Sequence, residues 1–269
     1  MASTSAGRRG GNQQSYSNYG TSSGGNKPTI DGVDTREDAG GSGFYYDYGA
    51  FQEVQIKAMG NDAEMATPGT QFIGILKSGT DTFRGSGYFA WETPKLQSGN
   101  VTDALRARGV KEGNPLKAYH DGNVDLGGPV LRRTLWFYGS YRNQHIKQGV
   151  LGYVASPGPD NVRGTADDVP GSYQVTLTNY TGKLSGQAGQ HRFSGFMQVQ
   201  EKDQPDRSAD AFHYRESTFH QIFKPRAGKA DWSWVASDRT YVNAFMGYWG
   251  YDTDILNETE APAAYDTVT

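Results

Sequence analysis

Between residues 82 and 251 the chain is a succession of stretches in which apolar and polar residues alternate, or in which aromatic and β-branched residues gather. Each such stretch predicts a β-strand. Most have about ten residues or slightly more, the length at which a tilted strand crosses a bilayer. One of them, Thr218–Val235, is too long for a single regular strand. The seven predicted strands are Thr82–Trp91, Ala118–Gly127, Thr134–His145, Tyr173–Gly186, His191–Lys202, Thr218–Val235 and Arg239–Tyr251.

The connections between the predicted strands alternate strictly between short and long. The short ones are Gly128–Arg133, Gln187–Gln190 and Ala236–Asp238, and the long ones are Glu92–Lys117, Ile146–Ser172 and Asp203–Ser217. A soluble β-sandwich has no reason to alternate in this way, whereas an outer-membrane barrel has short periplasmic turns and long extracellular loops. The alternation therefore favours a transmembrane β-barrel whose first predicted strand runs outward.

The two faces of several predicted strands differ in polarity. In the fifth strand, one face carries Phe193, Gly195, Met197 and Val199, and the other carries Arg192, Ser194, Phe196, Gln198 and Gln200. Apolar-out and polar-in alternation is typical of a barrel wall, although Phe196 and Phe245 break it, and a sandwich core with aromatic cross-strand pairs stays an alternative. Aromatic residues that could form girdles at the membrane interfaces are Trp136, Phe137, Tyr138, Tyr141, Trp232, Trp234, Tyr248 and Trp249.

Residues 27–80 have a different pattern, which predicts a small mixed unit ahead of the strands. Thr29–Val33 predicts a short strand that ends in a turn, Phe51–Ile56 alternates with period two and predicts a half-buried strand, and Phe72–Lys77 predicts a buried strand. Asn61–Ala66 has room for one helical turn. Residues 1–26 are rich in Gly, Ser, Asn, Gln and Tyr, and we expect them to be loop or disordered.

The composition supports β-structure with one wetted face. The chain has 36 Gly and 17 Tyr, and 13% of its 269 residues are aromatic although only 35% are hydrophobic. The net charge of −3 gives no basic excess to hold phosphates, so we expect no nucleic-acid partner. The absence of Cys excludes disulfides, thiol catalysis and Cys-ligated zinc.

No segment is long and apolar enough for a transmembrane helix, so any membrane insertion would be by β-strands. Residues 1–11 contain no apolar stretch of the kind found in a signal peptide. We therefore expect either that the sequence is that of a mature chain or that the true N-terminus lies upstream.

Several motifs between residues 28 and 145 resemble the plug-to-barrel junction of TonB-dependent outer-membrane receptors, most closely the Oar-like branch. The first group is Thr29-Ile-Asp-Gly-Val33, Phe51-Gln-Glu-Val-Gln-Ile56, Lys77-Ser-Gly-Thr80 and Phe83-Arg-Gly-Ser86. The second group is similar to the second and third barrel strands and comprises Gly113-Asn-Pro115, Asp125-Leu-Gly-Gly-Pro129 and Leu135-Trp-Phe-Tyr-Gly-Ser-Tyr141. Here Gly127-Gly128-Pro129 would form the tight periplasmic turn. Residues 146–269 match the family only in style.

The resemblance implies a barrel of about 22 strands filled by a plug, located in the bacterial outer membrane. It also implies uptake of a scarce solute such as a ferric siderophore, cobalamin or a glycan, with energy from the inner-membrane TonB complex. Residues 27–80 would be the C-terminal part of the plug and residues 81–269 the N-terminal part of the barrel. The expected fold class is mainly β: a partial plug domain followed by about seven antiparallel strands of an incomplete transmembrane β-barrel, with outer-membrane lipid as a partner.

Two segments are candidate binding sites. Tyr45, Tyr46, Asp47 and Tyr48 form an aromatic and acidic cluster, which the resemblance places near the plug apex, where Tyr rings could contact a sugar or an aromatic siderophore. Packing of this segment against the barrel wall is the alternative. In a predicted extracellular loop, Asp160, Asn161, Asp167 and Asp168 could bind Ca²⁺ through hard oxygen ligands, although the spacing is not that of an EF-hand and a solvated acidic loop explains the same residues.

The sequence contains no Gly-x-Ser-x-Gly elbow, phosphate-binding loop or dinucleotide fingerprint, so we expect no enzymatic activity and no cofactor other than the possible loop calcium. The pattern His213-x-x-Glu216-x-x-x-His220 lacks the zincin spacing. The alternative to a receptor is a secreted or surface β-sandwich that acts as an adhesin or glycan-binding module. Such a domain would fold alone in buffer.

Overall fold

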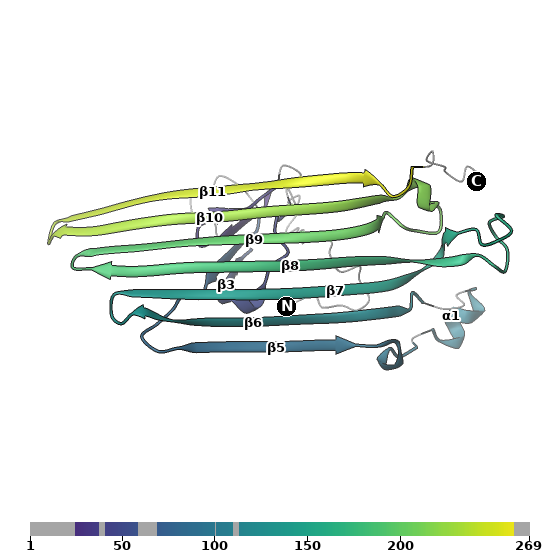
Figure 1. Ribbon diagram of the computed structural model, residues 1–269, viewed down its shortest axis with the longest axis horizontal. Helices are drawn as coiled ribbons and strands as arrows, with labels where there is room; N and C mark the ends of the chain where they lie inside the picture. The colour runs from purple at the N-terminus through teal and green to yellow at the C-terminus, as the bar shows by residue number, and fades with distance from the viewer. Residues whose placement is uncertain (1–24, 38–40, 59–68, 100, 110–112, 261–269) are drawn as a thin grey trace.

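The computed structural model describes residues 25–37, 41–58, 69–99, 101–109 and 113–260. A small four-stranded sheet comes first in the chain and a large seven-stranded antiparallel sheet follows it (Figure 1). This division agrees with the two patterns in the sequence. In the part of the chain that the structure describes, no helix is both long and apolar enough to span a membrane.

The small sheet consists of β1 (Lys27–Ile30), β2 (Val33–Asp34), β3 (Phe51–Lys57) and β4 (Gln71–Leu76), in the order β2-β1-β4-β3. Only the pair of β1 and β4 is parallel. The predicted strand at residues 29–33 ends at Ile30, because Asp31 and Gly32 adopt positive φ angles of 45° and 87° and reverse the chain. The predicted half-burial of β3 is wrong, since only Phe51 of this strand is buried. The predicted helical turn at residues 61–66 lies outside the described residues.

The large sheet contains its seven strands in chain order, each hydrogen-bonded to the next. They are β5 (Arg84–Glu92), β6 (Leu116–Leu131), β7 (Leu135–Ser156), β8 (Val169–Ala188), β9 (His191–Arg207), β10 (Phe219–Ser237) and β11 (Thr240–Asn257). The predicted number of strands is therefore confirmed. A Greek-key sandwich would distribute consecutive strands between two packed sheets, so this topology does not support the sandwich alternative.

The strands are longer than predicted, and the loops are correspondingly shorter. β7 has 22 residues and β8 has 20, because residues 146–156 and 169–172, expected to be loop, extend both strands. Thr218–Val235, predicted to be too long for one strand, corresponds to the single strand β10 of 19 residues. Short turns still gather at one end of the sheet and long connections at the other (Figure 1).

The predicted reversal at Gly127-Gly128-Pro129 is wrong, because all three residues lie within β6. The chain turns instead after Leu131, where Arg133 adopts a positive φ of 62°. Gly128 has a packing role: a Cβ added there would overlap the ring of Phe83. A glycine that looks like a turn former in the sequence thus allows a close approach between neighbouring segments.

The small sheet packs against one face of the large sheet, called the inner face here, and lies behind it in Figure 1. Phe44, Tyr46 and Phe72 of the N-terminal unit share one buried cluster with Phe196 of β9. Phe196 was an exception to the predicted polar face, and its position under the small sheet explains it. The opposite, outer face has no covering element among the described residues.

The residues of the predicted aromatic girdle do not all share one face of the large sheet, because neighbouring residues of a strand point to opposite faces. Phe137, Tyr141, Trp232, Trp234 and Tyr248 alternate with inner-face positions and therefore lie on the outer face. Three other predicted members lie on the inner face. They are Trp136, which donates to Asp81, Tyr138, which is buried against the small sheet, and Trp249, which packs on Phe44.

The helical segments whose bounds lie within the described residues are short and lie outside both sheets. They are the 3-10 turns η2 (Tyr48–Ala50), η3 (Pro94–Leu96) and η4 (Arg215–Ser217) and the helix α1 (Asp103–Ala107). η3 and α1 belong to the long connection between β5 and β6, and η4 to the connection between β9 and β10. η2 directly precedes β3 and places the segment 45–48 against the large sheet.

Candidate functional site

The inner face of the large sheet presents polar side chains at alternate strand positions to the N-terminal unit. Most of them are buried, and buried polar groups need hydrogen-bond partners. They are Asp121, Asn123 and Asp125 on β6, Ser140 and Arg142 on β7, Asn179 and Thr181 on β8, and Gln198, Gln200 and Lys202 on β9. The segment 45–48 supplies partners to several of them, so the candidate site is the interface between this segment and the inner face.

Asp47 is the centre of this interface. Asp47 is fully buried (0% exposed). Its carboxylate accepts hydrogen bonds from Asn123 Nδ2 at 2.9 and 3.0 Å, from Ser140 Oγ at 2.8 Å and from the backbone N–H of Gly49 at 3.0 Å. Burial raises the pKa of Asp47, although the hydrogen bonds of Ser140 and Gly49 and the positive charge of Arg142 oppose the shift. Ser140 and Arg142 of the large sheet therefore stabilise the charged form of the Asp47 carboxyl.

Arg142 joins the same segment to a second acid of the large sheet. Its guanidinium donates to both carboxylate oxygens of Asp121, at 2.8 and 2.6 Å, and also to the carbonyl oxygen of Tyr46 at 2.9 Å. The two charged side chains are only 8% and 5% exposed. Tyr88 Oη donates to Asp121 Oδ1, and Gln144 Nε2 donates to Asp121 Oδ2. This bidentate pair is thus completed by polar neighbours, as a buried ion pair requires.

Tyr45 is held by β9 through both its backbone and its side chain. Gln200 Oε1 accepts from the Tyr45 N–H at 3.0 Å, and Gln200 Nε2 donates to the Tyr45 carbonyl oxygen at 2.8 Å. Lys202 Nζ donates to the Tyr45 hydroxyl at 2.9 Å. Burial raises the pKa of the Tyr45 hydroxyl, with a further contribution from the charge of Glu37. The reciprocal amide contacts fix this segment to the sheet as an added backbone partner would.

The structure thus brings Tyr45, Tyr46 and Asp47 together on the inner face of the large sheet, in the packing arrangement that was the alternative to ligand binding. Tyr48 is the most open of the four predicted ligand-binding residues, with 40% of its surface exposed. Contact of these residues with a solute stays a prediction. Sequence reasoning missed Asn123, Ser140 and the other inner-face partners, although their period-two spacing along β6 and β7 was a signal for them.

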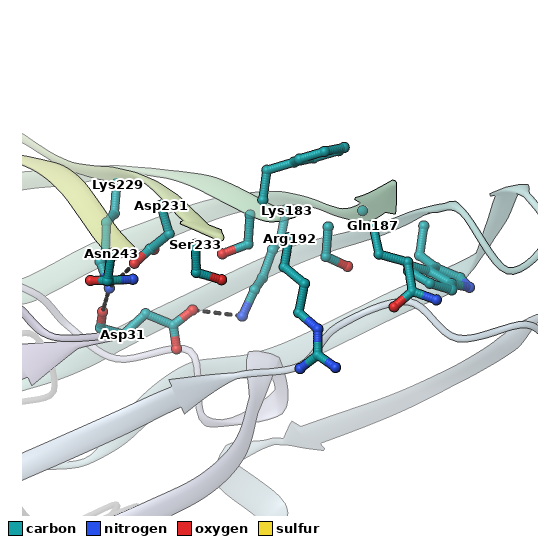
Figure 2. A pocket seen from close by; sticks show the side chains of 13 residues that line it. Asp31, Lys183, Gln187, Arg192, Lys229, Asp231, Ser233 and Asn243 are labelled. Carbon is teal, nitrogen blue, oxygen red and sulfur yellow. Dashed lines mark hydrogen bonds and ion pairs between the residues drawn. The ribbon is translucent and has the colours of Figure 1, made fainter. Parts of the chain in front are cut away.

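A polar cavity of about 600 Å³ lies on the inner face near the short turns (Figure 2). Asp31, in the β1–β2 turn, accepts from Lys183 Nζ at 2.6 Å, and its carbonyl oxygen accepts from Lys229 Nζ at 3.1 Å. Lys229 also pairs with Asp231 at 3.0 Å. The guanidinium of Arg192 also lines the cavity. The small sheet is therefore attached to the large sheet at this end by charge as well.

The predicted calcium ligands lie in the connection between β7 and β8 and contact their own loop. The Asp160 carboxylate accepts from the N–H of Val162, and the Asp168 carboxylate accepts from the N–H of Gly164. Asp167 accepts from Thr165 and from the N–H of Asp160, and these bonds lower its pKa. Asn161 adopts a positive φ of 57°. Calcium binding stays a prediction.

No group of three or more His, Cys, Asp or Glu residues suited to a metal ion occurs among the residues that the structure describes. The two histidines of the His213–His220 pattern have separate carboxylate partners. His213 Nδ1 lies 2.7 Å from Asp210, and His220 Nε2 lies 2.6 Å from Asp203.

Comparison with known proteins adds one finding to this geometry. The family model described as "Outer membrane beta barrel domain" matches residues 75–213, which is more than half of the chain. No curated protein and no solved structure is significantly similar to the chain. The matched region runs from the end of β4 through β9, and so contains most of the polar inner face described above. The chain therefore belongs to the family of outer membrane β-barrel domains.

Proposed function

We propose that the chain is part of a TonB-dependent receptor that takes up a scarce solute through a plugged barrel in the bacterial outer membrane. Residues 27–80 act as the C-terminal part of the plug, and the large sheet acts as the first part of the barrel wall. The observation that carries the proposal is the arrangement of the two sheets: the small sheet covers a polar face of the large sheet and leaves an apolar face bare.

A soluble protein of two layers would have the opposite arrangement, because apolar side chains are buried between layers and polar ones face water. In β9, Gln198 and Gln200 on the inner face are 1% and 0% exposed, whereas their neighbour Met197 on the outer face is 45% exposed. Leu184 on β8 is 54% exposed on the same outer face. A large bare apolar surface indicates contact with lipid or with another apolar partner. Lipid fits a family of outer-membrane barrels.

The edges of the large sheet support a wall that continues beyond these strands. β5 and β11 are the two edge strands of the seven-stranded sheet. Unpaired backbone N–H and C=O groups cost several kcal/mol each in a bilayer, so strands span membranes only in closed barrels. We propose that further strands, as in the family barrel of about 22, pair with β5 and β11 and close the wall.

The contacts between the two sheets suit a plug. Hydrogen bonds and ion pairs supply much of this interface, through Asp47, Arg142 and Lys183. Water can replace such contacts at low net cost, because a polar contact has a modest net free energy. An energised partner such as the inner-membrane TonB complex could therefore displace the plug without unfolding the wall. The transported solute is not specified by this interface, and no catalytic role is needed.

The proposal is tested by uptake in a Gram-negative host that produces the receptor containing this chain. Cells are given labelled ferric siderophores, cobalamin and oligosaccharides, with the tonB gene intact or deleted. We expect one solute class to accumulate only when both the receptor and TonB are present. Accumulation that does not depend on TonB contradicts the receptor proposal. Recovery of the chain as a folded, soluble monomer without detergent contradicts the membrane wall itself.

A further inference from the structure

The polarity of the large sheet inverts partway along its strands. In the half of β8 near the short turn, the outer face carries Tyr180 and Leu184, and the inner face carries Asn179, Thr181 and Lys183. In the half near the long connection the two faces exchange character. There the inner face carries the buried Tyr173, Val175 and Leu177, and the outer face carries Gln174, Thr176 and Thr178.

The neighbouring strand β7 inverts at the same level. Its outer face changes from Phe137 and Tyr141 to Asn143, His145 and Lys147. On its inner face, Ser140 and Arg142 lie near the short turn, and nearer the long connection Ile146 and Val150 alternate with Gln144 and Gln148. Tyr141 pairs with Tyr180, and Asn143 pairs with Thr178. The last apolar and first polar outer-face residues of the two strands are therefore direct neighbours, so the outer face changes character at the same level in both strands.

Five charged residues and one histidine continue this boundary across the outer faces of β9, β10 and β11. Their pairs are Glu201 with Lys224 at 3.8 Å, Asp203 with His220 at 2.6 Å, and Arg226 with Asp252. We call these three pairs the ionic collar. Charges on the lipid-facing side of a barrel strand are costly at the bilayer centre and tolerated near its interfaces. The ionic collar thus lies at the edge of the surface that lipid can cover.

The half of the sheet beyond the ionic collar has a hydrophobic core of its own. This core consists of Leu116, Ile146, Val150, Tyr153, Tyr173, Val175, Leu177 and Ala209. Ala209 comes from the connection between β9 and β10, which folds over the inner face at this end. The long connection between β7 and β8 contacts this connection through Arg163, which donates to both carboxylate oxygens of Glu216 at 3.1 and 2.9 Å. Apolar inside and polar outside is the arrangement of a sheet in water.

The strand lengths agree with this division. β8 and β9 have 20 and 17 residues, which exceeds the roughly 9–11 that a tilted strand needs to cross a bilayer. The parts of these strands with an apolar outer face, residues 180–188 and 191–199, each have about nine. Only the half near the short turns is therefore the right length for the membrane.

We infer that lipid covers only the half of the large sheet nearest the short turns, and that the other half stands in water beyond the outer leaflet as a wall with its own core. The ionic collar marks the boundary. This inference rests on the proposed insertion in the outer membrane, and it adds where the lipid-binding surface ends. The long connections and the hydrophobic core beyond the ionic collar then belong to a projecting, water-exposed mouth.

The test uses single cysteines, because the chain has none of its own. Leu184→Cys and Met197→Cys place a label on the outer face near the short turns, and Gln174→Cys and Thr176→Cys place it beyond the collar. Each full-length variant is labelled with an environment-sensitive fluorophore and reconstituted in phospholipid vesicles. We expect lipid-attached quenchers to act on the first two labels and aqueous iodide on the other two, with at least a threefold preference in each case.

Each other outcome has a definite meaning. If lipid quenches all four labels equally, the wall does not project and this inference is wrong, while membrane insertion stands. If iodide quenches all four labels, the proposed membrane insertion is wrong as well. A second measurement does not depend on reconstitution: in intact cells, a membrane-impermeant thiol reagent should modify Thr176→Cys and not Leu184→Cys. Equal modification of both positions overturns the inference.

Discussion

Removing the Asp47 carboxylate should release the segment 45–50 from the large sheet. In the native structure this carboxylate accepts two hydrogen bonds from Asn123 and one from Ser140, all within a fully buried site. Asp47→Ala leaves these donors without their acceptor while they stay buried. The backbone N–H of Gly49 loses the same acceptor. The damage should be local, because the strands of the large sheet pair with each other independently of Asp47.

The size of the effect follows from these contacts. A hydrogen bond to a charged group contributes about 1.5–3 kcal/mol, and an unsatisfied buried donor costs about 1–3 kcal/mol. Asn123 Nδ2 also donates to Ser140 Oγ at 3.0 Å, so part of the network survives. Loss of the carboxylate further removes the desolvation cost that raises its pKa. We therefore expect a net loss of about 3 kcal/mol, which is roughly a hundredfold change in a local opening constant.

Hydrogen–deuterium exchange of the membrane-reconstituted protein measures this opening directly. Amides of residues 44–51 should exchange about a hundredfold faster in Asp47→Ala, while amides of β7 and β8 keep their protection. The matched control is Glu53→Ala, which removes an exposed carboxylate of β3 that accepts a hydrogen bond from the exposed Gln55 side chain. Exchange in Asp47→Ala within threefold of the native protein would refute the assignment of Asp47 as the anchor.

Three further changes probe the junction and the large sheet. Gly79→Ala should destabilise the protein by about 1–3 kcal/mol in chemical denaturation, because the new Cβ overlaps a backbone oxygen of β7. The control Gly182→Ala, which has open space around it, should change stability by less than about 0.5 kcal/mol. Equal effects of the two substitutions would contradict the close approach of Gly79 to β7. Arg142→Gln should cost about 3–5 kcal/mol in the same assay, because it leaves a buried carboxylate unpaired, and a cost below about 1 kcal/mol would refute that role. The pKa of Asp81 is lowered by the backbone N–H of Arg133 and by an indole N–H, so its contribution is present above the ordinary carboxyl pKa and is lost as pH falls through the lowered value. Tryptophan fluorescence should show this acid transition, and Asp81→Asn should abolish it; an unchanged transition in the variant would contradict the contact.

The sequence predicts the number of strands in the large sheet and the alternation of its connections, because turn residues and period-two patterns are local signals. It does not predict where the strands end. The sequence predicts a loop at residues 146–156, yet they continue β7, and Ile146 to Gly149, Val154 and Ser156 pair with β8. A separate hydrophobic core at this end, which includes Ile146 and Val150, supports the longer strand, and no local pattern in the sequence reveals that core.

The candidate site shows a different limit of sequence reasoning. The alternation of Asp121, Asn123 and Asp125 is visible in the sequence and marks a polar face. The segment that this face binds is not visible, because Asn123 and Asp47 are 76 positions apart in the chain and their meeting depends on how the two sheets pack. An acidic residue among tyrosines therefore suggested a ligand site, whereas the geometry gives Asp47 partners within the protein itself.

The measurement that tests the membrane wall most directly is polarised infrared spectroscopy of the reconstituted protein in oriented bilayers. If the large sheet spans the membrane as a barrel wall, the amide bands should report strands tilted by about 35–45° from the bilayer normal. Strands that lie flat on the membrane plane, or that show no preferred orientation, would contradict the conclusion that the apolar outer face is embedded in lipid.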